Sequence, residues 1–305
     1  MSSLIVLKQM VMIFALILTG YFLYKKKLIS GAASKDLSAI VVDVCCPALI
    51  ISSMFQDMSG ISRKNVAIVA AAGIVYYAFL ILLGFGFTKF LKVPKKDKEA
   101  YVLMTVFGNL GFIGLPVASA ILGHESILYV VIFNFLYNIV IFTFGIMLVK
   151  KGVEGVERSW KDIFTPGFVS CFIAFAIYWF DLTVPASVQS VVHYCANACT
   201  FLSMLVIGMS VVGMKPAAVF GNRRLLLFTG IRFVLVPVVA ALLLQSVLTD
   251  YIMRATVVLM LALPAGNMPV MLAEQYGKDA HAISESIILS TLLSVVTITF
   301  VFMFV

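Results

Sequence analysis

The chain has 305 residues, of which 62% are hydrophobic and only 12% are charged, and its mean hydropathy is +1.10. A soluble domain carries about a quarter charged residues, so the composition excludes a soluble protein and predicts an all-α polytopic membrane protein. The net charge of +8 comes from short basic clusters between apolar runs, a pattern typical of a topology signal and not of a nucleic-acid-binding surface.

Ten stretches are long and apolar enough to cross a bilayer, which requires about 20 residues. They cover residues 4–24, 37–55, 65–88, 100–122, 126–149, 166–182, 188–213, 224–248, 253–276 and 281–304. The first has no clear small-residue cleavage site and ends on three lysines, so we expect a retained helix and not a cleaved signal peptide.

Lysine and arginine are concentrated in the odd-numbered connections between these spans, whereas the even-numbered connections hold only Arg63, Lys64 and Arg254. Cytoplasmic loops of membrane proteins carry an excess of basic residues. The odd-numbered connections are therefore predicted to be cytoplasmic. Ten spans of the cytoplasmic (inner) membrane then place both termini on its outer side. An odd number of spans would instead place the termini on opposite sides.

The ten spans divide into two sets of five. The first set occupies residues 1–149, a short cytoplasmic connection covers 150–165, and the second set occupies 166–305. Because five is odd, the second set enters the membrane in the opposite direction. The sequence therefore predicts ten transmembrane helices arranged as two inverted five-helix repeats.

The fourth and ninth spans are interrupted by Gly, Asn and Pro. The fourth contains Gly108-Asn109-Leu110-Gly111-Phe112-Ile113-Gly114-Leu115-Pro116, and the ninth contains Leu263-Pro264-Ala265-Gly266-Asn267-Met268-Pro269. Irregular backbone persists at membrane depth only inside protein or beside a water-filled cavity. Interrupted spans at matching positions of two halves indicate the binding site of a secondary transporter, although proline kinks that only shape packing are the simpler alternative.

We expect these broken helices to cross near the membrane midplane and to bind an organic anion, in particular a carboxylate. The ligands would be freed N–H groups, partially positive helix ends and the two asparagine amides. The predicted substrate-binding residues are Asn109, Gly111, Gly114, Pro116, Pro264, Asn267, Pro269 and Arg232.

Two charged residues within spans have competing interpretations. Asp43, in the second span, is a candidate for proton or cation coupling, because an intramembrane carboxylate is costly and tends to face a cavity; a structural ion pair is the alternative. Arg232, in the eighth span, can bind a substrate carboxylate through its guanidinium fork, pair with Asp43, or extend toward the interface. Asn134 and Asn138 share a face of the fifth span and are expected to form interhelical hydrogen bonds.

The interrupted motifs, together with ten spans in two halves, resemble the auxin efflux carrier family, which includes plant auxin exporters and bacterial malate and malonate carriers. The resemblance covers the whole chain. It implies a fold similar to that of bile-acid/sodium symporters, with a scaffold domain and a transport domain that moves against it in an elevator-type alternation. The long cytoplasmic loop of the plant exporters is missing, so the resemblance does not specify auxin as substrate.

The predicted function is secondary transport of a small mono- or dicarboxylate, with a proton as the expected coupling ion. A sodium-coupled symporter and an anion channel are the alternatives. No Walker motif or hydrolase signature is present, so neither an ATP-driven pump nor an enzyme is predicted. The cysteines lie in apolar segments, and the weak spacing of His193, Cys195 and Cys199 predicts no metal or cofactor. The expected partners are the anion and the lipid bilayer; a homodimer is compatible with the pattern.

Overall fold

A computed structural model describes residues 2–55, 63–123, 125–151, 164–210, 212 and 220–305. The helices are α1 (Ser2–Lys25), α2 (Gly31–Ile40), α3 (Cys46–Ser52), α4 (Arg63–Phe90), α5 (Lys98–Val106), α6 (Leu115–Leu122), α7 (Glu125–Val140), α8 (Ile146–Lys150), α9 (Pro166–Trp179), α10 (Ala186–Ser210), α12 (Arg223–Gly230), α13 (Val236–Leu244), α14 (Tyr251–Ala262), α15 (Met268–Gln275) and α16 (His281–Val301). Most of the predicted connection at 150–165 lies outside the described residues.

Wider π-helical turns join several of these helices into longer rods. They are η1 (Val41–Cys45), η4 (Leu110–Gly114), η5 (Ile141–Gly145) and η7 (Ile231–Leu235). The turns η1 and η7 each end shortly before a proline, Pro47 and Pro237. A proline in a helix has no N–H to donate and crowds the preceding turn, and a π-turn is one way for the backbone to accommodate this loss.

Four described stretches are long and apolar enough to cross a membrane, and a bent pair forms a fifth. They are Ala67–Phe90, Glu125–Lys150, Ala186–Met209, Arg223–Leu244 and the pair His281–Ser294 with Val296–Phe304. Shorter apolar helices occur at Phe14–Lys25, Pro166–Trp179 and Tyr251–Ala262. The described chain is therefore helical with several membrane-spanning candidates, as expected of a polytopic membrane protein. The count of ten and the inverted repeats stay predictions.

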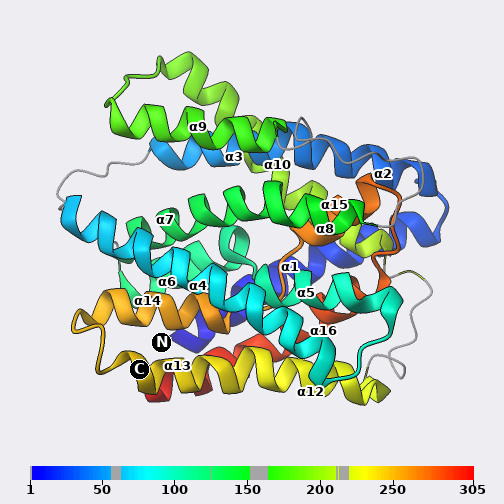
Figure 1. Cartoon of the computed structure of the whole chain (residues 1–305). Coiled ribbons are helices and arrows are strands. Elements are labelled where there is room, and N and C mark those ends of the chain that lie inside the picture. Colours follow the sequence, from blue (N-terminus) through cyan, green and yellow to red (C-terminus); the bar gives the residue numbers. More distant parts are fainter. Residues whose placement is uncertain (1, 56–62, 124, 152–163, 211, 213–219) are drawn as a thin grey trace.

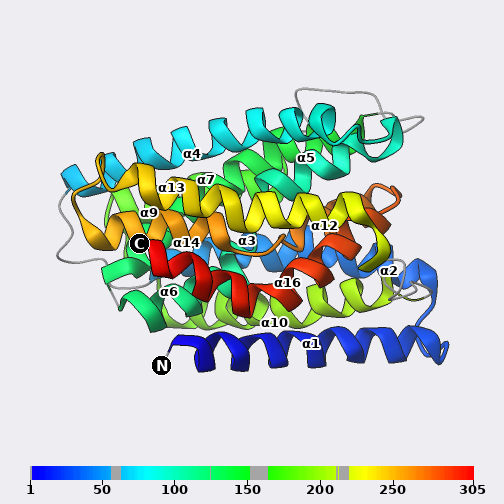
Figure 2. The same ribbon diagram turned by 90° about the horizontal axis from the view of Figure 1, so that it is seen from below.

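The helices run along a common axis, and the two termini lie at the same end of the molecule (Figures 1 and 2). At the opposite end α1 finishes on Lys25, while α5 and α12 begin with Lys98 and Arg223. The basic residues Lys25, Lys98 and Arg223 thus lie at the end remote from the termini, whereas Arg63 and Lys64, which begin α4, lie at the same end as the termini.

The helices pack as two groups. In the first group α1 packs against α10, and α3 packs against both α9 and α10. In the second, α4 packs against α5 and α7, α13 against α14, and α16 against α5, α14 and η7. Helix α15 of the interrupted ninth stretch contacts α2, which continues through η1 into α3, so the broken segments lie where the two groups meet.

Glycines allow α1 and α10 to pack closely. A Cβ atom on Gly208 would collide with the backbone of Ile17 and Tyr21, and one on Gly20 would collide with the backbone of Leu205. Small residues at such positions let membrane helices approach backbone to backbone, where van der Waals contact drives their association.

We therefore predict that Gly208→Ala destabilises the protein by about 1–3 kcal/mol, the usual cost of overpacking. Its thermal unfolding midpoint in detergent should fall. Gly86→Ala is the matched control, since its Cβ would meet no atom within 4 Å, and alanine favours a helix by about 1 kcal/mol over glycine. Equal midpoints for the two variants would contradict the close packing of α1 and α10.

Candidate functional site

The two broken segments meet in a short antiparallel pairing. The backbone N–H of Asn109 donates to the carbonyl of Pro264 at 2.9 Å, and the N–H of Gly266 donates to the carbonyl of Phe107 at 2.8 Å. A Cβ on Gly266 would stand 2.7 Å from the carbonyl oxygen of Gly108, so glycine is required for this approach. The pairing satisfies backbone groups that would otherwise be unpaired in a buried setting.

Each broken segment resumes as a helix directly after an asparagine. The carbonyl of Asn109 accepts from the N–H groups of Ile113 and Gly114, and that of Asn267 accepts from the N–H groups of Val270 and Met271. The η4–α6 segment and α15 thus both begin at the crossing. A helix N-terminus carries roughly half a positive elementary charge, so two such ends converge here.

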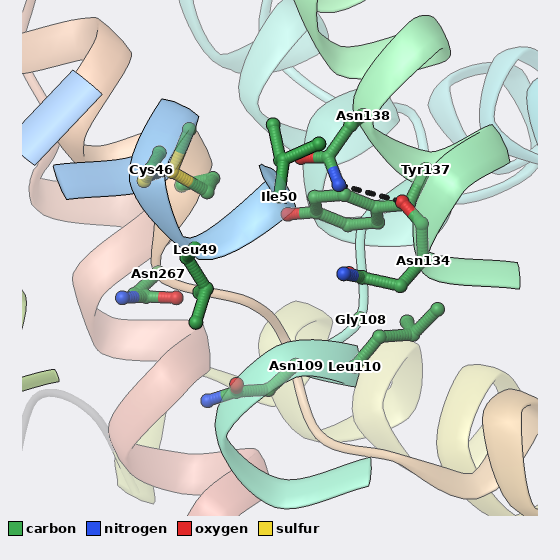
Figure 3. A pocket seen from close by; sticks show the side chains of 11 residues that line it. Cys46, Leu49, Ile50, Gly108, Asn109, Leu110, Asn134, Tyr137, Asn138 and Asn267 are labelled. Carbon is green, nitrogen blue, oxygen red and sulfur yellow. Dashed lines mark hydrogen bonds between the residues drawn. The ribbon is translucent and has the colours of Figure 1, made fainter. Parts of the chain in front are cut away.

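A small pocket that is partly open to solvent lies beside this crossing (Figure 3). Its walls come from three sources: the crossing, α3 and α7. The lining residues are Cys46, Leu49, Ile50, Gly108, Asn109, Leu110, Asn134, Tyr137, Asn138, Asn267 and Met268.

The pocket lining combines amide and phenol groups with apolar side chains and contains no charged residue. Asn109 and Asn267 lie on the crossing side, Asn134, Tyr137 and Asn138 lie across from them, and the α3 side chains stand between these two sides (Figure 3). The side-chain nitrogen of Asn267 is buried and has no hydrogen-bond partner among the described residues. An unpaired buried donor usually has a functional or solvent partner; in Figure 3 the oxygen of this amide faces Leu49, and the unpaired nitrogen points the other way.

The predicted site residues divide into those that line the pocket and those that shape its backbone. Asn109 and Asn267 line it. Gly114 instead packs beneath Leu263, whose Cδ1 would stand 2.8 Å from an added Cβ. Pro264 supplies a carbonyl to the antiparallel pairing, and Pro269 is buried in the first turn of α15.

Two further predicted residues have described backbones only. Gly111 lies in η4 and Pro116 in the first turn of α6, and the surroundings of their side chains lie outside the described part of the structure. Their direct contact with a substrate stays a prediction.

Arg232 is fully buried but is not among the pocket-lining residues. Its Nε donates to the carbonyl of Thr105 and its Nη1 to the carbonyl of Leu261, each at 2.7 Å. Those carbonyls belong to the last turns of α5 and α14, where helix carbonyls have no partner of their own and the helix dipole is negative. Arg232 therefore holds together the two helix ends that precede the crossing.

Asp43 also lies away from the pocket lining. Its Oδ2 accepts a hydrogen bond from Nε2 of Gln275 at 2.9 Å, and Ser34, nine residues earlier in the chain, donates to the neighbouring Glu274 at 3.2 Å. Both contacts join the α2–η1 segment to α15. The predicted alternative of an ion pair between Asp43 and Arg232 is wrong, because the bonds described for the two side chains go to these other partners.

Sequence reasoning did not identify the α7 side of the pocket. Asn134 and Asn138 were expected to bond to another helix, but Nδ2 of Asn138 donates to the carbonyl of Asn134 within α7 at 2.7 Å. Both side chains line the pocket with Tyr137. Their spacing marked a shared polar face, but it did not reveal that this face meets the crossing.

The described residues contain no cluster of three or more His, Cys, Asp or Glu side chains arranged to hold a metal ion. The pocket is accordingly built from amides, a phenol, thioether and thiol groups and apolar side chains. Such a lining can orient a small ligand, and it contains no arrangement of nucleophile and base.

A pocket beside paired broken helices in a polytopic helical protein is typical of membrane transport proteins. The profile of the family described as "Membrane transport protein", the auxin efflux carrier family, matches residues 5–159 and 155–302, and the chain belongs to this family.

Three similar proteins span nearly the whole chain. An "Uncharacterized transporter" of Methanothermobacter thermautotrophicus is 21% identical, with 94% of each chain covered. "Uncharacterized transporter MJ1031" of Methanocaldococcus jannaschii is 23% identical, with 93% of each covered. A "Putative malonate transporter" of Rhizobium meliloti is 24% identical, covering 94% of this chain and 91% of its own.

The position of Arg232 leads to a prediction about stability. Arg232→Met should lower the free energy of unfolding by at least about 2 kcal/mol, because two buried carbonyls lose their donors and each costs about 1–3 kcal/mol. Thermal unfolding in detergent would measure the change, with the exposed Arg223→Met as the control. A variant that keeps its unfolding midpoint but loses anion binding would show that Arg232 contacts substrate directly.

Proposed function

We propose that the protein is a secondary transporter that moves a small organic anion across the cytoplasmic membrane, with the substrate bound at the crossing of the broken helices. The observation that carries this proposal is the convergence of two helix N-termini and two asparagine side chains on one uncharged pocket. Helix N-termini favour carboxylates through their N–H groups and their dipole, and half-helices pointing at a substrate anion are typical of secondary transporters.

The charge balance of the pocket favours a monovalent anion. Each helix N-terminus contributes roughly half an elementary charge, so the two together offset about one negative charge. None of the eleven lining side chains carries a positive charge that would balance a second carboxylate. The relative from Rhizobium meliloti is named for malonate; we infer that a dicarboxylate would occupy this pocket with one carboxyl group protonated.

The packing supports a mechanism in which two helix groups move against each other. The pocket lies between α3 of the first group and the crossing and α7 of the second. A substrate bound there contacts both groups, so sliding one against the other would change which side the pocket faces. We propose this elevator-type movement as the transport step, with α1, α3, α9 and α10 as the scaffold.

Two observations support the proposed inverted repeats. Cys46 and Cys199 touch through their sulfur atoms and are 153 positions apart, the interval that also separates Pro116 from Pro269. Contact between equivalent residues of two repeats is expected at the axis that relates them. The helix packing is also reciprocal between the two halves. The first helix of each half packs on the second span of the other half: α1 packs on α10, and α9 packs on α3.

The sidedness of the protein follows from the gathering of basic clusters at one end. We propose that this end is cytoplasmic, because membrane proteins retain Lys and Arg on that side. Both termini, which lie at the other end in Figures 1 and 2, would then face outward.

The substrate site can be tested with purified protein in proteoliposomes. Asn109→Ala and Asn267→Ala should each lower saturable uptake of a small monocarboxylate at least tenfold, because a hydrogen bond to a charged group contributes about 1.5–3 kcal/mol. Asn197→Ala, on the exposed surface of α10, should behave as wild type. Uptake that does not saturate, or that is unaffected in both pocket variants, would exclude the crossing as the site.

We further propose that Asp43 carries the coupling proton. Asp43→Asn keeps an oxygen that can accept from Gln275 but removes the titratable charge, so uptake should lose its response to an imposed pH gradient. Asp36→Asn, on the exposed face of α2, is the matched control. An unchanged pH response, or uptake in wild type driven by a sodium gradient alone, would contradict the proposal.

A further inference from the structure

Three sulfur atoms from three helices meet beside the pocket. The Sγ of Cys46 in α3 lies 3.4 Å from the Sγ of Cys199 in α10 and 3.3 Å from the Sδ of Met268, the first residue of α15. All three side chains are buried, and Cys46 and Met268 also line the pocket. The two cysteines are free thiols.

This cluster has the chemistry of a soft-metal site. Thiolate and thioether sulfurs select Cu(I) over hard cations, which prefer oxygen ligands. The described residues contain no metal-binding group of three or more Cys, His, Asp or Glu side chains. This cluster differs from that pattern because its third ligand is a methionine. No competing oxygen or nitrogen ligand is needed to complete three-fold coordination.

The two sulfur–sulfur distances from Cys46, 3.4 Å to Cys199 and 3.3 Å to Met268, are slightly shorter than those around a three-coordinate metal. With metal–sulfur bonds of about 2.3 Å, three sulfurs around one ion stand about 4 Å apart. The Cys46–Cys199 and Cys46–Met268 distances would each need to lengthen by roughly half an ångström, on the order of what side-chain rotation allows.

We propose that Cys46, Cys199 and Met268 form a binding site for a soft monovalent cation, Cu(I) or its analogue Ag(I). On binding, each thiol releases its proton to solvent and the metal keeps its oxidation state, so no redox partner is required. The product has two thiolates and one monovalent cation and therefore carries one net negative charge. The N-terminus of α15, which begins at Met268, stabilises that charge.

A bound metal would stop transport for two reasons. It would place a negative charge at the helix end that is proposed to receive the substrate anion, and it would tie α15 to α3 and α10 across the two helix groups. This consequence rests on the proposed function, whereas metal binding itself does not. The site thus provides inhibition by thiophilic metals.

Metal binding can be measured on the full-length protein in detergent, without transport. Anaerobic Cu(I) titration against a chromogenic chelator should give one tightly bound ion per chain. Cys46→Ser and Cys199→Ser should weaken binding at least a hundredfold, and Met268→Leu at least tenfold. Cys171→Ser is the matched control, since Cys171 is buried in α9 and its thiol donates to the carbonyl of Gly167. Thermal unfolding of each apo variant would verify that it is folded.

Several outcomes would overturn the proposal. If the wild-type protein binds Cu(I) no more tightly than the folded Cys46→Ser or Cys199→Ser variant, the site does not exist. Unchanged affinity in Met268→Leu would exclude the three-sulfur assignment. In proteoliposomes, stoichiometric Cu(I) should abolish anion uptake by wild type but not by Cys199→Ser. Tight Cu(I) binding with undiminished uptake would overturn the predicted inhibition and leave the metal site itself in place.

Discussion

The structure depends on the requirement that backbone polar groups in a membrane be paired within the protein. At the crossing this requirement is met by two hydrogen bonds, from Asn109 to Pro264 and from Gly266 to Phe107. Because each broken segment satisfies the other, neither can exist alone at membrane depth. The same pairing releases two helix N-termini into one pocket, so the feature that makes the breaks tolerable also creates the positive potential that a binding site for anions needs.

The carboxyl ends of the helices that precede the crossing are bound by Arg232. The helices α5 and α14 end with carbonyls that would make the crossing negative, and Arg232 bonds to one carbonyl from each. A single buried cation thus offsets the two negative helix ends while the two positive ends remain available to the pocket. The charge of the arginine is thus directed to the carboxyl ends of α5 and α14, and the pocket lining itself contains no charged residue.

The breaks and the asparagines could be predicted from sequence because Gly, Asn and Pro inside an apolar stretch have a local meaning that does not depend on the rest of the fold. The role of Arg232 could not, since its partners are carbonyls of α5 and α14 and no sequence pattern indicates which carbonyls lie unpaired nearby. The α7 lining was missed for a related reason. Asn134 and Asn138 mark a polar face, but only tertiary packing decides what that face meets.

The contact between α2 and α15 has a consequence for movement. Ser34 of α2 bonds to Glu274, and Asp43 of the following η1 turn bonds to Gln275. Hydrogen bonds to ionised carboxylates contribute about 1.5–3 kcal/mol and neutral ones about 0.5–1.5 kcal/mol, and water can replace the lost partner when the surfaces part. A closely packed apolar interface would instead oppose sliding, because its interdigitated side chains would have to be displaced. In the proposed movement of the two helix groups, these polar contacts of α15 can be exchanged for contacts with water.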